Sequence, residues 1–215
     1  MTVFLQHNRV RLALHTLRSG DGPRLLLLHA LGDRSPERLP AEFEPWPGAV
    51  FALDFTGHGS SSVPAGGGYT AEVLMGDADV ALAAIGPATV VGRGLGGYIA
   101  LLLAGARPAQ VRGIAVLDGA GLAGGGDTPG PAVVRGVPGA LSAPDPFALV
   151  ELGSDLRPRP YVRRFAELAV EASKMADPIA VCARQRPAWL EAVLEVPGVV
   201  EEPLEAALRR FALAG

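Results

Sequence analysis

The stretch VVGRGLGGYIA, residues 90–100, decides the fold, because a cluster of glycines joins a short apolar run to a long apolar segment. The continuous run Thr89–Val91 is typical of a strand that is buried on both faces of a parallel sheet. The segment Leu95–Ala104 is apolar almost all round, which predicts a buried central helix. A buried strand that turns directly into a buried helix favours a doubly wound, mostly parallel α/β sheet.

Similar apolar runs lie on both sides of this stretch and alternate with helical patterns. The sequence therefore predicts further strands at Leu25–Leu28, Val50–Leu53, Ile114–Leu117, Ile179–Ala183 and Val199–Glu201, after a hairpin of Val3–His7 and Val10–Leu17 that turns near Asn8. Helices are expected to start at Ser35-Pro36-Glu37 and Asp145-Pro146, and to cover Leu74–Ile85, Tyr161–Lys174, Pro187–Leu194 and the C-terminal segment through Phe211. Asp77 and Asp79 lie off the apolar stripe of their helix, so both are expected to be solvated.

No linker separates two hydrophobic cores, so residues 1–215 are expected to form a single domain. Residues 119–139 are rich in glycine, proline and alanine, which predicts an irregular excursion. We expect residues 119–177 to form a cap or lid over the carboxyl ends of the strands. The chain after this lid is expected to form a compressed C-terminal part of the sheet.

Composition and charge exclude several classes of protein. The formal net charge is −3, so we expect no nucleic-acid partner. The sequence shows neither an apolar run long enough for a bilayer nor a signal peptide, which predicts a cytoplasmic protein without a membrane partner. Cys182 is the single cysteine, so an internal disulfide is excluded. His29, Asp54 and His58 lack metal-ligand spacing, and we expect neither a metal nor another cofactor. The sequence leaves the oligomeric state undetermined.

Three loops together indicate a known architecture. They are LLLLHALGD at residues 25–33, DFTGHGSS at residues 54–61 and VGRGLGG at residues 91–97, and each follows a predicted strand. Their order and spacing resemble the α/β-hydrolase family. In that family they correspond to the His-Gly loop after strand three, the Asp-x-x-Gly-x-Gly-x-Ser loop after strand four and the Gly-x-Ser-x-Gly-Gly nucleophile elbow. The resemblance covers residues 1–120 well and the remainder poorly.

The sequence departs from the family at the elbow, where Gly94 occupies the position of the attacking serine. Glycine has no side chain to attack with, and it adopts this turn without the strain of about 1–3 kcal/mol that another residue would bear. The family's catalytic histidine comes late in the chain, whereas the last of the four histidines here is His58. We expect His7 and His15 at the surface, and the resemblance gives His29 and His58 structural roles.

The acid of the family's triad is also missing from its usual place. That place is the end of the predicted strand near Cys182, and the following residues through Arg186 include no carboxylate. Some relatives use the end of the preceding strand, where this chain has Asp118. An acid without its histidine has nothing to orient. We therefore expect a pseudoenzyme, and His29 and Asp118 are the candidate catalytic residues that remain.

The resemblance implies that the oxyanion hole survives, because backbone N–H groups build it. The donors would be the amides of Leu31 and Leu95. The second of these also starts the central helix, whose N-terminus favours an anion or a carbonyl oxygen. Arg93 would add a positive charge at the rim. These three residues are the predicted ligand-binding positions.

Three functions follow from this combination of features. The first is a non-catalytic binder of a small molecule with a carbonyl or carboxylate group. The second is a divergent hydrolase- or lyase-like enzyme that uses the retained oxyanion hole with His29 or Asp118, or with His58, as the base. The third is a protein-interaction module in which the compressed part after Ile179 exposes an apolar face. We rank them in this order.

Overall fold

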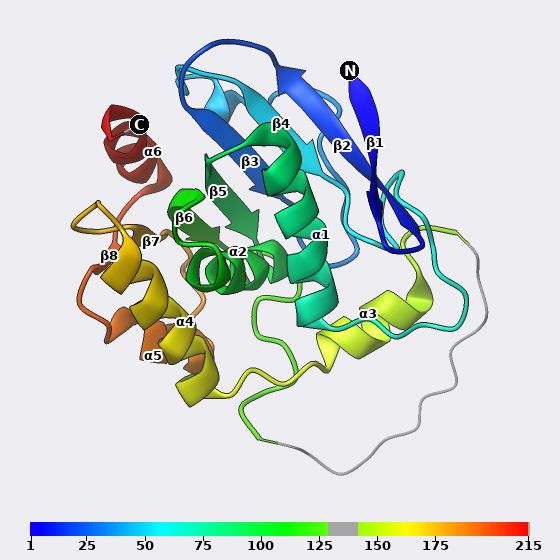
Figure 1. The fold of residues 1–215 in the computed structure, drawn as a ribbon. Coiled ribbons are helices and arrows are strands. Elements are labelled where there is room, and N and C mark those ends of the chain that lie inside the picture. Colours follow the sequence, from blue (N-terminus) through cyan, green and yellow to red (C-terminus); the bar gives the residue numbers. More distant parts are fainter. Residues whose placement is uncertain (129–141, 215) are drawn as a thin grey trace.

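The computed structural model describes residues 1–128 and 142–214, and in these ranges the strands form one eight-stranded sheet (Figure 1). The strand order is β1-β2-β4-β3-β5-β6-β7-β8. The pairs β1–β2 and β2–β4 are antiparallel, and all the other pairs are parallel. The predicted doubly wound, mostly parallel sheet is therefore confirmed. The strands are β1 (Thr2–His7), β2 (Val10–Arg18), β3 (Arg24–Leu28), β4 (Val50–Leu53), β5 (Ala88–Arg93), β6 (Val111–Leu117), β7 (Ile179–Val181) and β8 (Val199–Glu201).

Helices cover both faces of this sheet. Helices α1, α2, α4 and α5 contribute to the core on one face, and α6 with the short 3-10 helix η1 packs on the other. Figure 1 shows α1, α2 and α4 side by side in front of the strands. The helices are η1 (Ala41–Phe43), α1 (Ala71–Ile85), α2 (Leu95–Ala106), α3 (Pro146–Gly153), α4 (Arg159–Ala172), α5 (Ala188–Leu194) and α6 (Leu204–Leu213).

The continuous apolar runs of the sequence reflect strands that are buried on both faces. In β3, Leu26 and Leu28 belong to the core under α1 and α2, whereas Leu25 and Leu27 belong to the core under α6. Successive side chains of a strand point to opposite faces, so a strand between two helical layers needs an apolar residue at every position.

Helix α2 lies close against the sheet because of the glycines at its start. A Cβ atom on Gly96 would lie 2.7 Å from the carbonyl oxygen of His29, which is closer than real Cβ atoms approach. This close approach brings the end of β3 and the start of α2 together at the carboxyl edge of the sheet. The site that the sequence predicts lies at this edge.

Two local predictions near this edge are wrong. No helix starts at Ser35-Pro36-Glu37, and the only helical turn between β3 and β4 is η1. The Ser35 amide instead donates to Asp54 Oδ1 at 2.7 Å, so the neighbouring loop uses a group that a helix start would leave free. Asp77 is fully buried rather than solvated, because it accepts hydrogen bonds from the Thr56 amide and from His7.

The helix start at Asp145 is confirmed, since its Oδ1 accepts from the Phe147 amide at 3.1 Å and caps α3. Of the expected lid, residues 129–141 lie outside the described residues. Helix α4 packs against α2 and α5 and belongs to the helical layer rather than to a roof. The limits of a lid therefore stay a prediction. The strand β8 does join the sheet, next to β7.

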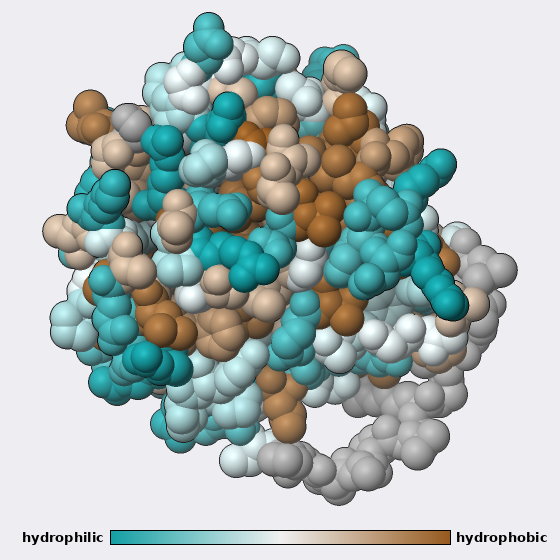
Figure 2. Space-filling view, viewed as in Figure 1, coloured by the Kyte–Doolittle hydropathy of each residue, from teal (hydrophilic) through white to brown (hydrophobic). Residues whose placement is uncertain are grey.

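The surface of the helical face is mixed. Figure 2 shows apolar residues over α1 and the β1–β2 hairpin, interspersed with hydrophilic side chains. The exposed large apolar residues on these elements are Val3, Phe4 and Val73. Within residues 1–128 and 142–214, no helix is long and apolar enough to span a membrane.

Candidate functional site

The elbow between β5 and α2 holds Gly94 in a conformation with φ 53° and ψ −119°. A Cβ atom here would overlap the carbonyl oxygen of Ala120 and would lie 2.6 Å from the carbonyl carbon of Gly119. Position 94 therefore lacks both a nucleophilic side chain and the space for one. The chain after β6 fills the space that a serine would need, which is a stronger obstacle to nucleophilic attack than the missing hydroxyl alone.

The two predicted oxyanion donors do converge on one point. The amides of Leu31 and Leu95 both donate to the carbonyl oxygen of Ala120, at 3.1 and 3.0 Å. This is the geometry in which an oxyanion hole would hold a substrate oxygen. The occupant is the protein's own backbone. Ala120 carries no side-chain signal, so the sequence could not identify it, although the glycines on either side allow a tight approach.

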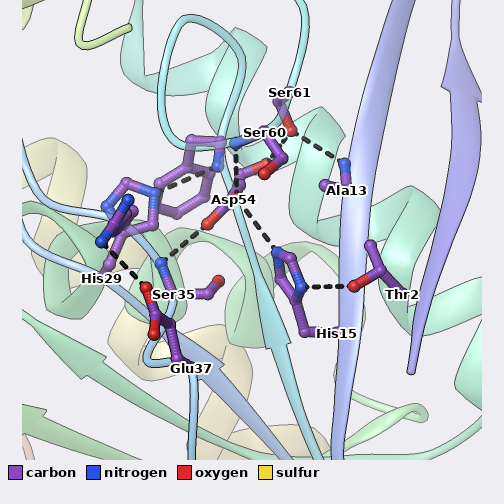
Figure 3. Close-up of polar contacts among 11 residues, drawn as sticks. Thr2, Ala13, His15, His29, Ser35, Glu37, Asp54, Ser60 and Ser61 are labelled. Carbon is purple, nitrogen blue, oxygen red and sulfur yellow. Dashed lines mark hydrogen bonds and ion pairs between the residues drawn. The ribbon is translucent and has the colours of Figure 1, made fainter.

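His29 is buried, and both of its ring nitrogens have partners. Nε2 accepts from the Phe55 amide at 3.1 Å, so the proton is on Nδ1, which donates to the carbonyl oxygen of Ala30 at 2.8 Å. Burial, reinforced by the nearby His58, lowers the pKa of His29 to about 4. A neutral ring with its lone pair already engaged holds the loop after β3 against the loop after β4 (Figure 3).

His58 is satisfied in the same way. Its Nδ1 donates to the carbonyl oxygen of Thr56 at 3.0 Å, and its Nε2 accepts from the Gly32 amide at 3.2 Å. Burial lowers its pKa below the ordinary value. Its ring centroid lies 5.0 Å from that of His29, so the two neutral rings pack together between the loops.

The remaining histidines, His7 and His15, are each hydrogen-bonded to a carboxylate rather than free at the surface. His7 Nδ1 lies 2.7 Å from Asp77 Oδ1, and His15 Nε2 lies 3.0 Å from Asp54 Oδ2. Each imidazole is only 20% exposed, so the expectation of surface histidines is wrong. His15 also contacts Thr2 Oγ1, at 2.9 Å, through its other nitrogen (Figure 3).

Asp54 is the centre of the polar network in Figure 3. Its carboxylate accepts from the amides of Ser35 and Ser60, each at 2.7 Å. Burial alone would raise its pKa, but these two amides and His15 outweigh that effect and lower it. Ser61 Oγ donates to the backbone oxygen of Asp54 at 2.6 Å. The carboxylate therefore organises a loop, and its oxygens already have partners.

Asp118, the other candidate acid, caps backbone amides at the end of β6. Its carboxylate accepts from the amides of Arg184 and Gln185 at 2.9 Å, which fastens the loop after β7. Cys182, in the same loop, has a pKa raised to about 12 by burial, so its thiol stays protonated at neutral pH.

Arg93 lies at the rim of a pocket with a volume of about 170 Å³. Its guanidinium pairs with Glu42 at 2.8 Å. The pocket is lined by residues of the β3 and β5 ends, of β6 and of the η1 segment, and these include His29, Ala30, Arg34, Phe43, Val91 and Leu117. Its lining contains no residue of α3 or α4, although both lie in the range 119–177 that was expected to form a lid over this edge.

The geometry thus brings the amides of Leu31 and Leu95 together on the carbonyl oxygen of Ala120. Arg93 belongs to a pocket of its own, and Asp118 serves the loop after β7. In the ranges 1–128 and 142–214, no cluster of three or more histidine, cysteine or carboxylate side chains could hold a metal ion.

A comparison with models of protein families agrees with this architecture. A family model described as the alpha/beta hydrolase family matches residues 25–213. Mouse alpha/beta hydrolase domain-containing protein 10 is 24% identical, with a TM-score of 0.49 over 58% of this chain and 50% of that chain. An N-acyl homoserine lactone degrading enzyme is 26% identical, with a TM-score of 0.47 over 56% and 47%. An epoxide hydrolase from Vigna radiata is 20% identical, with a TM-score of 0.45 over 54% and 39%. The chain spans half or less of the length of these structures, and no curated protein matches it.

Proposed function

Because the chain belongs to the alpha/beta hydrolase family, we propose that it is a member without the serine–histidine–acid triad that binds a small carbonyl- or carboxylate-bearing molecule and does not hydrolyse it. The observation that carries the proposal is the pair of amides, Leu31 and Leu95, that donate to the carbonyl oxygen of Ala120. Catalysis by an oxyanion hole needs donors that are aimed at the reacting oxygen. Here the chain itself occupies them.

The hydrogen bonds of the histidines support the loss of catalysis. A general base must reach the proton that it abstracts with a free lone pair. The lone pair of His29 accepts from the Phe55 amide, and that of His58 accepts from the Gly32 amide. Asp118 is bound to backbone amides. The alternative of lyase-like chemistry by His29 or Asp118 therefore gains no support from this geometry.

The pocket beside Arg93 supports the binding half of the proposal. It joins an apolar wall, which includes Phe43 and Leu117, to one guanidinium group at its rim. Arginine binds carboxylates through charge-assisted hydrogen bonds. A small carboxylate would take the place of Glu42 on this guanidinium, while its apolar part would fill the pocket.

Hydrolysis of p-nitrophenyl acetate and butyrate tests the first half. We expect the native protein and Gly94→Ser to release nitrophenol no faster than buffer, because the serine variant still lacks a base and a free oxyanion hole. A serine-reactive fluorophosphonate should leave both proteins unlabelled. Turnover by the native protein that is lost in His29→Ala would overturn the claim that the protein is non-catalytic.

Calorimetric titration with acetate, butyrate and hexanoate tests the second half. We expect saturable binding that weakens by about tenfold in Arg93→Gln, the loss of one charge-assisted hydrogen bond. The matched control is Arg164→Gln, because that guanidinium pairs with Glu167 and Glu171 on the exposed face of α4. Equal affinities in both variants would remove the pocket beside Arg93 from the proposal.

A further inference from the structure

The segment Gly119–Leu122 after β6 forms a turn that is fixed at two carbonyl groups. The Leu122 amide donates to the Gly119 carbonyl at 3.2 Å and closes the turn. The Ala120 carbonyl accepts from the amide pair described above. The Leu122 carbonyl accepts from Trp189 Nε1 at 2.7 Å and from Arg157 Nη1. The Ala120 carbonyl, which fills the oxyanion hole, is therefore only two residues away from the Leu122 carbonyl, which is also held by hydrogen bonds.

The donors at that second point come from distant parts of the chain. Arg157 lies between α3 and α4, and its own amide donates to the carbonyl of Gly126 at 2.8 Å. Trp189 belongs to α5 and packs edge-on against Tyr98 of α2, with ring centroids 5.2 Å apart. The Leu122 carbonyl therefore connects the turn to both the α3–α4 connection and the helical layer.

Arg157 is an unusual residue to find in this place. Its side chain is 1% exposed, and its guanidinium lies 4.2 Å from the centroid of the Tyr98 ring. In the described part of the chain, its Nε and Nη2 atoms have no hydrogen-bond partner, and the side chain's hydrogen bond goes to Leu122. Burying a guanidinium with unpaired donors destabilises a fold, so a specific contact has to compensate. The contacts that do so are those with the Tyr98 ring and with the Leu122 carbonyl of the turn.

The packing around Arg157 argues against a bound ligand at its free donors. Gly124 lies so close that a Cβ atom on it would be 2.8 Å from the guanidinium carbon. The side chain is therefore enclosed by the chain itself, between Gly124 and the Tyr98 ring. By contrast, Ala120 is exposed, whereas Leu122 at the end of the same turn is buried in the core.

We propose that Arg157 and Trp189 form a clamp on the Leu122 carbonyl, and that this clamp holds the Ala120 carbonyl between the amides of Leu31 and Leu95. The clamp residues act as positioning residues. Releasing them lets the turn leave, and the two amides then become available to the oxygen of a small carboxylate. This site is distinct from the pocket beside Arg93, so the proposal does not depend on ligand binding there.

Amide hydrogen exchange by NMR tests the clamp in the intact protein. Arg157→Met removes the donor and keeps much of the volume, and Trp189→Phe removes the indole N–H and keeps a ring. In both variants we expect the Leu31 and Leu95 amides to exchange about tenfold faster, as in a local opening. The Gly97 amide, which bonds to the Gly94 carbonyl at the start of α2, should keep its protection.

The matched control is Arg210→Met. Arg210 also donates to a backbone carbonyl, that of Asp177, and also lies over an aromatic ring, that of Phe211, but on α6 at the other face. This variant should leave the Leu31 and Leu95 amides as protected as in the native protein. Protection unchanged in both clamp variants would overturn the proposal, and so would an equal acceleration in the control. If Arg157→Met fails to fold, Trp189→Phe decides the question.

Titration with sodium acetate gives the second readout. The amide signals of Leu31 and Leu95 should shift saturably in the clamp variants, and by more than any shift that acetate bound beside Arg93 causes in the native protein. Amides that exchange faster without any acetate-dependent shift would contradict the claim that the vacated donors accept a carboxylate. Arg93 is intact in all these proteins. A negative result for the clamp therefore does not affect the proposal that a carboxylate binds beside Arg93. A negative result for binding beside Arg93 likewise leaves the test of the clamp valid.

Discussion

Two loops at the carboxyl edge of the sheet, residues 54–61 and residues 119–122, are both held in place by hydrogen bonds, but by different chemical groups. The first is fastened by side chains, since the Asp54 carboxylate accepts two amides and the Ser61 hydroxyl closes the loop. The second is fastened by backbone carbonyls, those of Ala120 and Leu122. The first leaves a motif in the sequence, and the second leaves almost none.

The two loops also differ in what their hydrogen bonds do. The side-chain network around Asp54, His29 and His58 holds the loops after β3 and β4 together through hydrogen bonds to backbone groups. It stabilises the fold whether or not a nucleophile is present. The backbone turn instead lies at the predicted oxyanion hole, because it puts the Ala120 carbonyl between two amide donors.

The largest expected effect is that of Gly94→Ala, which tests how firmly the backbone turn is fixed. The methyl group would overlap the Ala120 carbonyl, so strain and overpacking together should lower the free energy of unfolding by about 4 kcal/mol. Gly66→Ala is the control, because Gly66 also has a positive φ, of 90°, but nothing lies within 4 Å of its Cβ position. Gly66→Ala should lower the free energy of unfolding by about 1–2 kcal/mol, from backbone strain alone. If urea unfolding shows that Gly94→Ala and Gly66→Ala lose the same free energy of unfolding, the turn at Ala120 moves aside easily.

A smaller effect concerns the side-chain network and its dependence on pH. The pKa of His29 falls from 6.5 to about 4 on burial, and that of His58 is also lowered. The unfolded chain therefore binds more protons between these pH values, so stability is full above pH 6.5 and declines as pH falls toward 4. The loss attributable to His29 is on the order of 3 kcal/mol. Asp54, whose pKa is lowered from 3.8, contributes only at lower pH.

Urea unfolding at pH 7, 6, 5 and 4 measures this decline. His29→Gln removes one of the two titrating rings, so its stability should be lower at pH 7 and should decline less steeply. A slope equal to that of the native protein would show that the buried imidazole of His29 does not titrate in this range.

The smallest effects distinguish the two carboxylates, Asp54 and Asp118, that bind backbone amides of neighbouring loops. Asp54→Asn places an amide N–H₂ among the donors of Ser35, Ser60 and His15, and should lower the free energy of unfolding by about 2 kcal/mol at pH 7. Asp118→Asn keeps an acceptor for the Arg184 and Gln185 amides at a partly exposed site, and should cost less than about 1 kcal/mol. The reverse order would mean that the loop after β7 depends more on its carboxylate than the Asp54 loop does.

The strands and most of the helices could be predicted because their signal is local. Continuous apolar runs identify strands such as β3 and β5, and Asp145 before Pro146 identifies the start of α3. The prediction of a helix at Ser35 failed because its amide bonds to Asp54, a residue of the next strand's loop. The prediction that Asp77 is solvated failed for a similar reason, because its partner His7 is 70 residues away in the sequence.

The sequence by itself determined the architecture, the absence of a nucleophile at Gly94 and the absence of a histidine after His58. It also identified Leu31 and Leu95 as a converging pair of amides. Only the tertiary structure decided that the Ala120 carbonyl occupies this pair and that Arg157 fastens the same turn. The physical reason is that every residue carries a carbonyl group, so the residue type says nothing about which carbonyl the fold will bring to a given donor.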